Sequence, residues 1–185
     1  MKAKVNKVTI EIIQGDIFAL EVDGIIISST PSLTLPQEIL DYVGEGVQSE
    51  ATQIGTCDVG SAVVTSAGNI SHANKLIHTV GPRWGEGSER GKLSNAAWRA
   101  LLLAEETELK SIAIPPISVG ALGYPVEGAA RAILEKVIDV TFETLKHLRH
   151  ITICVSTQVA FEAFVEEFKR QLENLKESGE GKVRV

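Results

Sequence analysis

The sequence has few cysteines and no long apolar run. Its 185 residues include two cysteines, Cys57 and Cys154, which lie far apart with no second cysteine near either. Such a pair builds neither a disulfide framework nor a CxxC motif, and it is typical of a reduced, cytoplasmic protein. No apolar stretch reaches the ~20 residues that cross a bilayer, and the N-terminus lacks a signal-peptide core. We therefore expect neither membrane insertion nor secretion.

Positive charge is also in short supply. Lysine and arginine total 18 against 24 acidic residues, which gives a formal net charge of −6. A protein whose main affinity comes from neutralising nucleic-acid phosphates carries the opposite charge. Nucleic acid is therefore not an expected partner.

Several familiar catalytic motifs are missing. The sequence contains no GxSxG elbow, no Walker loop and no HExxH helix. His147 and His150 are three residues apart, but no cysteine or acidic residue stands at metal-ligand spacing beside them. We therefore expect neither a metal site nor a cofactor.

The remaining composition is that of an ordinary globular domain, with 44% hydrophobic and 23% charged residues. Short β-branched or apolar runs between turn residues predict about six strands. These runs cover residues 8–13, 25–27, 62–65, 76–80, 111–114 and 151–155. Several are apolar on both faces, as expected of strands that helices cover on both sides.

Apolar residues at three- and four-residue spacing predict helices between the strands. The clearest helix follows Pro125, which suits the first helical position, and carries an apolar stripe from Val126 to Ile138. Others are expected over residues 36–43, 96–109 and 161–175. The alternation predicts an α/β fold, a three-layer α/β/α sandwich with a mixed, mostly parallel central sheet. We expect one domain over residues 1–175 and a flexible polar tail over 176–185.

Ligands of open α/β sheets gather beyond the carboxyl ends of the strands. The segments at these places are residues 15–17, 28–32, 115–125 and 156–158. The third holds Gly120 and Gly123 just before a helix N-terminus. Backbone N–H groups there can approach a phosphate or diphosphate without obstruction by side chains. A tight strand-to-helix connection accounts for the same glycines equally well.

Asp16, just after the first predicted strand, also has two interpretations. An ionised carboxylate only accepts hydrogen bonds, which suits recognition of an exocyclic amine such as that of adenine. An aspartate at this position is also a common turn or cap residue, and for one residue taken alone that is the more frequent case.

Taken together, these segments resemble the macro domain family. The resemblance is carried, in family order, by Gly15-Asp16-Ile17 and residues 22–26, 60–65, 77–82 and 113–125. It implies a pocket for ADP-ribose in which Asp16 bonds the adenine amino group, with Ile17 beside it. It further implies that the diphosphate and distal ribose are held by Ser118, Val119, Gly120, Ala121, Leu122, Gly123 and Tyr124. The residues implied for the adenine-side wall are Ser156, Thr157 and Phe161.

The segment after the second strand departs from the family pattern. Hydrolytic members typically show Asn-Ala-Ala-Asn followed by a glycine-rich loop, whereas this chain reads Ile27-Ser28-Ser29-Thr30 and has no glycine in residues 31–36. Thr30 offers a ligand only a hydroxyl, whereas an asparagine amide offers a donor and an acceptor together. Catalysis by the usual route of the family is therefore not expected.

Three functions remain open. The first is binding of ADP-ribose, a related nucleotide or an ADP-ribosylated protein. The second is hydrolysis of ADP-ribosyl proteins or of O-acetyl-ADP-ribose. The third is a domain that has exchanged its nucleotide for a protein or nucleic-acid partner, which we expect if Leu33, Leu35 and Pro36 plug the cleft.

Overall fold

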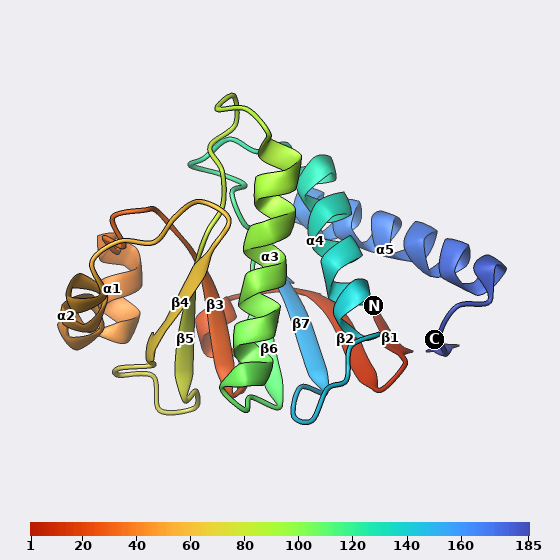
Figure 1. Cartoon of the computed structure of the whole chain (residues 1–185), viewed down its shortest axis with the longest axis horizontal. Helices are drawn as coiled ribbons and strands as arrows, with labels where there is room; N and C mark the ends of the chain where they lie inside the picture. The colour runs from red at the N-terminus through yellow and green to blue at the C-terminus, as the bar shows by residue number, and fades with distance from the viewer.

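A mixed sheet of eight strands runs through the molecule, and the computed structural model describes all 185 residues (Figure 1). From one edge to the other the strands are β4 (Ala62–Ser66), β5 (Lys75–Val80), β3 (Gly24–Ser29), β6 (Ser111–Ile114), β7 (His150–Val155), β2 (Val8–Gln14), β1 (Lys2–Val5) and β8 (Val183–Arg184). The pairs from β5 to β2 are parallel, while β4, β1 and β8 pair in antiparallel fashion at the edges. The mixed, mostly parallel sheet predicted from the sequence is confirmed.

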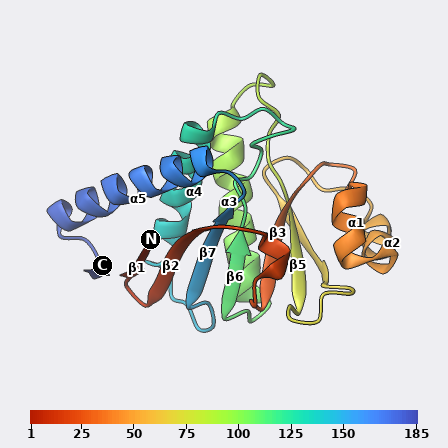
Figure 2. The ribbon, with the colours of Figure 1, turned by 180° about the vertical axis from the view of Figure 1, so that it is seen from behind.

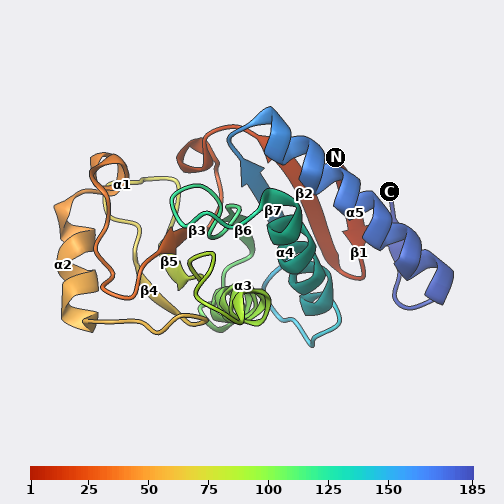
Figure 3. The same cartoon turned by 90° about the horizontal axis from the view of Figure 1, so that it is seen from above.

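Helices cover both faces of the sheet. The helices are α1 (Gln37–Val43), α2 (Glu45–Ile54), α3 (Glu89–Glu106), α4 (Val126–Val140) and α5 (Gln158–Ser178), with a short 3-10 turn, η1 (Ile17–Ala19). Figures 2 and 3 show α1 and α2 at one end of the molecule and α4 and α5 towards the other. No helix is both long and apolar enough to span a bilayer.

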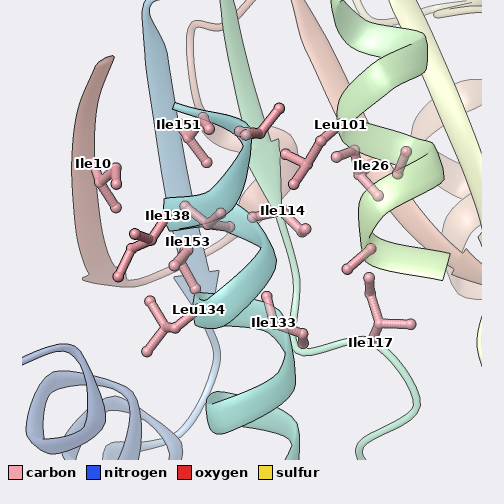
Figure 4. Packing of buried hydrophobic residues seen from close by; sticks show 14 of the residues in the cluster. Ile10, Ile26, Leu101, Ile114, Ile117, Ile133, Leu134, Ile138, Ile151 and Ile153 are labelled. Atoms are coloured by element: carbon pink, nitrogen blue, oxygen red, sulfur yellow. The ribbon is translucent and has the colours of Figure 1, made fainter. Parts of the chain in front are cut away.

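Alternation along the strands divides the core into two layers. Ile26 on β3 packs in the large cluster with α3, α4 and α5, whereas its neighbours Ile25 and Ile27 pack in a second cluster with α1, α2 and η1. Successive side chains of a strand point to opposite faces, so an apolar run such as residues 25–27 serves both layers. Figure 4 shows part of the larger cluster, in which Ile133 and Leu134 of α4 pack together with Ile151 and Ile153 of β7.

Helix α4 forms where the sequence predicts it. It begins at Val126 after Pro125, and its predicted apolar stripe is buried in the large core cluster from Ala129 onwards. Helix α3, by contrast, begins at Glu89, seven residues before the predicted Ala96. The pattern misses α2 entirely, because this helix buries only Val47 and Ala51 and is separated from α1 by Gly44 alone. Gly44 has φ +87°, a conformation that suits glycine and turns the chain between the two helices.

The C-terminal segment differs from the flexible tail expected over residues 176–185. Helix α5 continues to Ser178, and β8 then pairs with β1 in antiparallel register. The N–H of Asn6 donates to the Lys182 carbonyl at 2.7 Å, and the N–H of Lys182 donates to Asn6 Oδ1 at 3.0 Å. The polar composition of residues 176–185 does not predict these hydrogen bonds, because they form only where the distant strand β1 leaves its backbone groups free to pair.

Candidate functional site

A cavity of about 570 Å³ opens at the carboxyl end of the parallel strands. It is bounded by the segments that follow β2, β6 and β7 and by one side of α1. Its lining residues are Gly15, Asp16, Ile17, Phe18, Glu38, Ile39, Tyr42, Pro115, Pro116, Cys154 and Ser156. This is where open α/β sheets usually bind their ligands.

Asp16 presents its carboxylate at this cavity. It is the N-cap of η1, and its Oδ1 accepts a hydrogen bond from the Phe18 N–H at 3.0 Å. Its Oδ2 accepts a hydrogen bond from the Tyr42 hydroxyl at 3.1 Å. A carboxylate has about four acceptor sites, so Asp16 keeps lone pairs for a ligand. Asp16 is thus both a cap and an available acceptor, and the two interpretations of this residue are compatible.

An aromatic pair forms one wall of the cavity. The rings of Phe18 and Tyr42 are stacked, with centroids 4.7 Å apart and planes inclined by 16°. The hydrogen bond to the Asp16 carboxylate raises the pKa of Tyr42 above its ordinary value, because it favours the protonated phenol. Sequence reasoning missed Tyr42, because the predicted helix over residues 36–43 does not reveal which side faces Asp16.

Cys154 lies on the cavity floor as a thiol rather than a thiolate. Its Sγ donates to the Gly15 carbonyl at 3.5 Å. Burial raises the pKa of Cys154 to about 11. A nucleophilic cysteine needs the opposite shift, so this residue shapes the cavity without offering a reactive group.

The loop after β6 presents unpaired backbone donors. The N–H groups of Val119, Gly123 and Tyr124 bond carbonyls within the same loop, at 3.2, 2.9 and 3.0 Å. The N–H groups of the intervening residues 120–122 have no partner in the protein. Gly120 has φ +87°, and no atom lies within 4 Å of the place that a Cβ would occupy. Consecutive free N–H groups of this kind, close to the N-terminus of α4, form a seat for an anion.

The loop after β3 folds onto the core instead of into the cavity. Leu33 is fully buried with Ala51, Cys57 and Val80, and Leu35 packs in the second core cluster. Gln48 of α2 fixes this loop by accepting the Leu35 N–H at 2.8 Å. Leu33, Leu35 and the exposed Pro36 do not line the cavity and so do not plug it. The structure therefore gives no support from this loop to a domain that has exchanged its nucleotide for another partner.

The structure distributes the predicted site residues unevenly. Asp16, Ile17 and Ser156 line the cavity, whereas residues 119–124 do not. Within that loop only residues 120–122 keep free N–H groups, and Val119 and Tyr124 pack in the large core cluster. Ser118 is buried and donates its N–H to Ser28 Oγ at 3.3 Å. Thr30 is exposed outside the cavity, where its Oγ1 lies 3.3 Å from Ser32 Oγ.

Phe161 does not lie on the cavity wall assigned to it by resemblance. Its half-buried side chain packs against the large core cluster, one turn into α5. Thr157 instead caps this helix, with its side chain accepting the Ala160 N–H at 3.1 Å. No group of three or more histidine, cysteine or acidic side chains is arranged to hold a metal ion.

Comparison with known proteins points to one family. The family model described as the macro domain matches residues 35–133. A macro domain-containing protein of Listeria monocytogenes is 40% identical over 135 residues, which cover 68% of this chain and 76% of the relative. The O-acetyl-ADP-ribose deacetylase of Salmonella typhimurium is 39% identical over 140 residues, which cover 70% of this chain and 78% of the relative.

Solved structures match over a longer part of the chain. The Oceanobacillus iheyensis macrodomain with ADP superposes with a TM-score of 0.88 at 25% identity, covering 94% of this chain and 97% of the other. The matches in sequence and structure lead to one conclusion. This chain belongs to the macro domain family.

Proposed function

We propose that the protein binds ADP-ribose, with the adenine in the cavity beside Asp16 and the diphosphate over residues 120–122. The macrodomain of Oceanobacillus iheyensis, similar in fold and 25% identical, has been solved with ADP. The observation that carries the proposal for this chain is the run of three unpaired N–H groups next to a cavity that ends in a carboxylate.

The cavity has the chemistry to recognise adenine. The exocyclic amine of adenine donates hydrogen bonds, and Asp16 only accepts them. The Ile17 N–H, which has no partner in the protein, adds a donor for a ring nitrogen. The stacked rings of Phe18 and Tyr42 and the prolines at 115 and 116 supply flat apolar surface for the base.

The loop after β6 has the chemistry to hold a diphosphate. Its backbone N–H groups carry partial positive charge and can bind an anion without any lysine or arginine side chain. The loop can therefore attract a diphosphate even though the protein has a net charge of −6. The N-terminal end of α4 adds its own positive potential. Pro115 and Pro116 line the cavity and precede Gly120 in the same segment, and the proposed ligand would span the two places.

The proposal is tested by isothermal titration of the protein with ADP-ribose, ADP and AMP. We expect one ligand per chain, with affinity falling from ADP-ribose and ADP to AMP as phosphate contacts are lost. The absence of heat and of any thermal shift at millimolar ADP-ribose would refute it. We extend the proposal to ADP-ribose that is attached to a protein, since the same site would receive it.

The two unpaired, buried cysteines support a cytoplasmic location for this protein.

Hydrolysis of an ADP-ribose derivative is the second candidate, since the Salmonella typhimurium relative is an O-acetyl-ADP-ribose deacetylase. The side chains at the end of β3 and in the first residues after it offer only hydroxyls for holding a water, and Ser28 Oγ already accepts a hydrogen bond from the Ser118 N–H. We therefore place binding before turnover. Product analysis after incubation with O-acetyl-ADP-ribose or an ADP-ribosylated protein separates the two: substrate that is bound but unchanged identifies a binding module.

A further inference from the structure

A second hollow, of about 570 Å³, lies at the β1–β8 edge of the sheet. It is lined by Lys4, Asn6, Lys7, Gly181, Lys182 and Arg184. Four of these residues are cations and none is acidic. The hollow lies at the start of β2, whereas Asp16 follows its end, and a strand of seven residues separates the two by about 20 Å. Figures 1 and 2 show both chain ends at this edge.

The cations at this hollow form no ion pairs. The ion pairs of the structure all lie elsewhere, and none involves Lys4, Lys7, Lys182 or Arg184. Lys4 stands directly opposite Arg184 in the register of β1 and β8. Like charges facing each other across a strand pair are destabilising, so a bound anion would relieve this repulsion.

The backbone that carries these cations is held in place. Asn6 adopts φ +55° in the turn between β1 and β2. Its backbone N–H donates to the Lys182 carbonyl, and its side-chain Oδ1 accepts a hydrogen bond from the Lys182 N–H. Its Nδ2 also donates to Thr141 Oγ1 at 3.0 Å. These hydrogen bonds join residues from the two ends of the sequence. Because they already order the backbone, binding of a ligand would lose little backbone entropy.

We propose that this hollow binds a compact anion carrying several phosphate groups. Lysine and arginine are the usual partners of phosphate oxygens, and arginine can bind them through two parallel N–H groups. The ring of Phe142 lies against Gly181 but lines a different cavity, and no aromatic side chain lines the hollow as a platform for stacking a base. The phosphates themselves are therefore the recognised groups, whether they come from an inorganic polyphosphate or from a nucleotide.

Cations at a sheet edge also discourage pairing with the edges of other sheets. That role accounts for Arg184 on the edge strand β8. It does not account for Lys4, whose strand β1 is covered by β8, or for Lys7 in the hairpin turn. The two roles give different results when these residues are changed.

The test is isothermal titration of the full chain with inorganic tripolyphosphate at low salt. The titrations use the Gly120→Glu variant, in which the seat proposed for the nucleotide diphosphate is blocked. Binding of tripolyphosphate to this variant therefore reports on the hollow. We expect one anion per chain. Combined substitution Lys4→Gln, Lys182→Gln and Arg184→Gln should weaken binding at least about tenfold. The matched control, Lys110→Gln, Lys169→Gln and Lys176→Gln, removes the same charge from exposed lysines elsewhere and should leave binding unchanged.

Several results would overturn the proposal. The proposal fails if tripolyphosphate does not bind the Gly120→Glu protein. It also fails if the two triple variants weaken tripolyphosphate binding equally, because the loss of affinity would then follow from net charge alone. A third is binding of single-stranded oligonucleotide without binding of tripolyphosphate. ADP should bind the Gly120→Glu protein no more tightly than pyrophosphate, and a marked preference for ADP would contradict recognition by phosphates alone. If the triple variant fails to fold, Lys7→Gln in the turn carries the test, and unchanged affinity would then count against the proposal.

Discussion

The backbone N–H of Trp84 donates to the Leu122 carbonyl at 2.8 Å and so joins the loop after β5 to the loop of free amides. The Trp84 ring meets Tyr124 edge to face, with centroids 5.0 Å apart, and remains 52% exposed. Its backbone partner belongs to the anion seat, so a large exposed aromatic surface stands at the rim of that seat. Such a surface suits the distal ribose of a ligand whose diphosphate lies over residues 120–122.

This relationship predicts that Trp84 reports ligand length. The protein has two tryptophans, and Trp98→Phe leaves Trp84 as the remaining one. In that variant, ADP-ribose should change the tryptophan fluorescence and AMP should not, because AMP lacks the distal ribose. Trp84→Ala should weaken ADP-ribose several-fold while leaving AMP affinity unchanged. Equal effects on both ligands would remove Trp84 from the distal side of the site.

Asp16→Ala should weaken ADP-ribose by about tenfold or more, since a hydrogen bond to a charged group contributes about 1.5–3 kcal/mol. Asp41→Ala is the matched control, because Asp41 is an exposed carboxylate on the neighbouring helix α1 that bonds Gln37 and does not line the cavity. Isothermal titration of both variants gives the comparison. Equal affinities for the two would show that adenine is recognised elsewhere.

Gly120→Glu should abolish binding of ADP-ribose, because a carboxylate placed at the seat repels the diphosphate. The substitution also strains the backbone, since Gly120 has φ +87°. Gly179→Glu controls for this strain: Gly179 has φ +71° in equally open space at the end of α5, far from the site in sequence. Thermal melts should show similar stability for the two variants, and only the first should lose the ligand. Retained affinity in Gly120→Glu would mean that the diphosphate binds elsewhere.

His78 on β5 predicts a loss of stability in acid. It is fully buried, its Nε2 lies 2.8 Å from Thr65 Oγ1, and its Nδ1 has no partner. Burial lowers the pKa of His78 from 6.5 to about 4. The unfolded chain therefore binds a proton below pH 6.5 that the folded protein refuses until about pH 4.

The stability that His78 contributes is thus complete above pH 6.5 and falls as the pH approaches 4. Acidification from neutral pH to about 4.5 should cost the parent about 2–3 kcal/mol more than His78→Gln, because only the parent carries this linkage. Urea unfolding of both proteins at the two pH values gives the difference. Parallel losses in parent and variant would show that His78 is not the responsible group.

The sequence was sufficient where a local pattern determines the structure. The stripe after Pro125 predicts α4, and the apolar runs predict the strands of the parallel sheet, because burial on both faces leaves few polar positions such as His78 and Thr79. The position of Asp16 and of the glycine loop beyond strand ends also follows from the fold class, whereas their role in binding remains a proposal.

Features that depend on contacts between distant segments were missed. The pairing of β8 with β1 rests on Asn6 and Lys182, which lie at opposite ends of the chain. The direction in which Tyr42 points is fixed by how α1 packs against η1, and no periodicity encodes that. The resemblance alone implies Phe161 at the adenine-side wall, whereas its half-buried side chain on α5 packs against the core.

The central claim, that the N–H groups of residues 120–122 receive a diphosphate, is tested most directly by amide NMR. On addition of ADP-ribose, the three amide resonances should move strongly downfield and their exchange with water should slow, whereas the amides of β8 should remain unchanged. Saturable binding of ADP-ribose that leaves those three resonances in place would contradict the account.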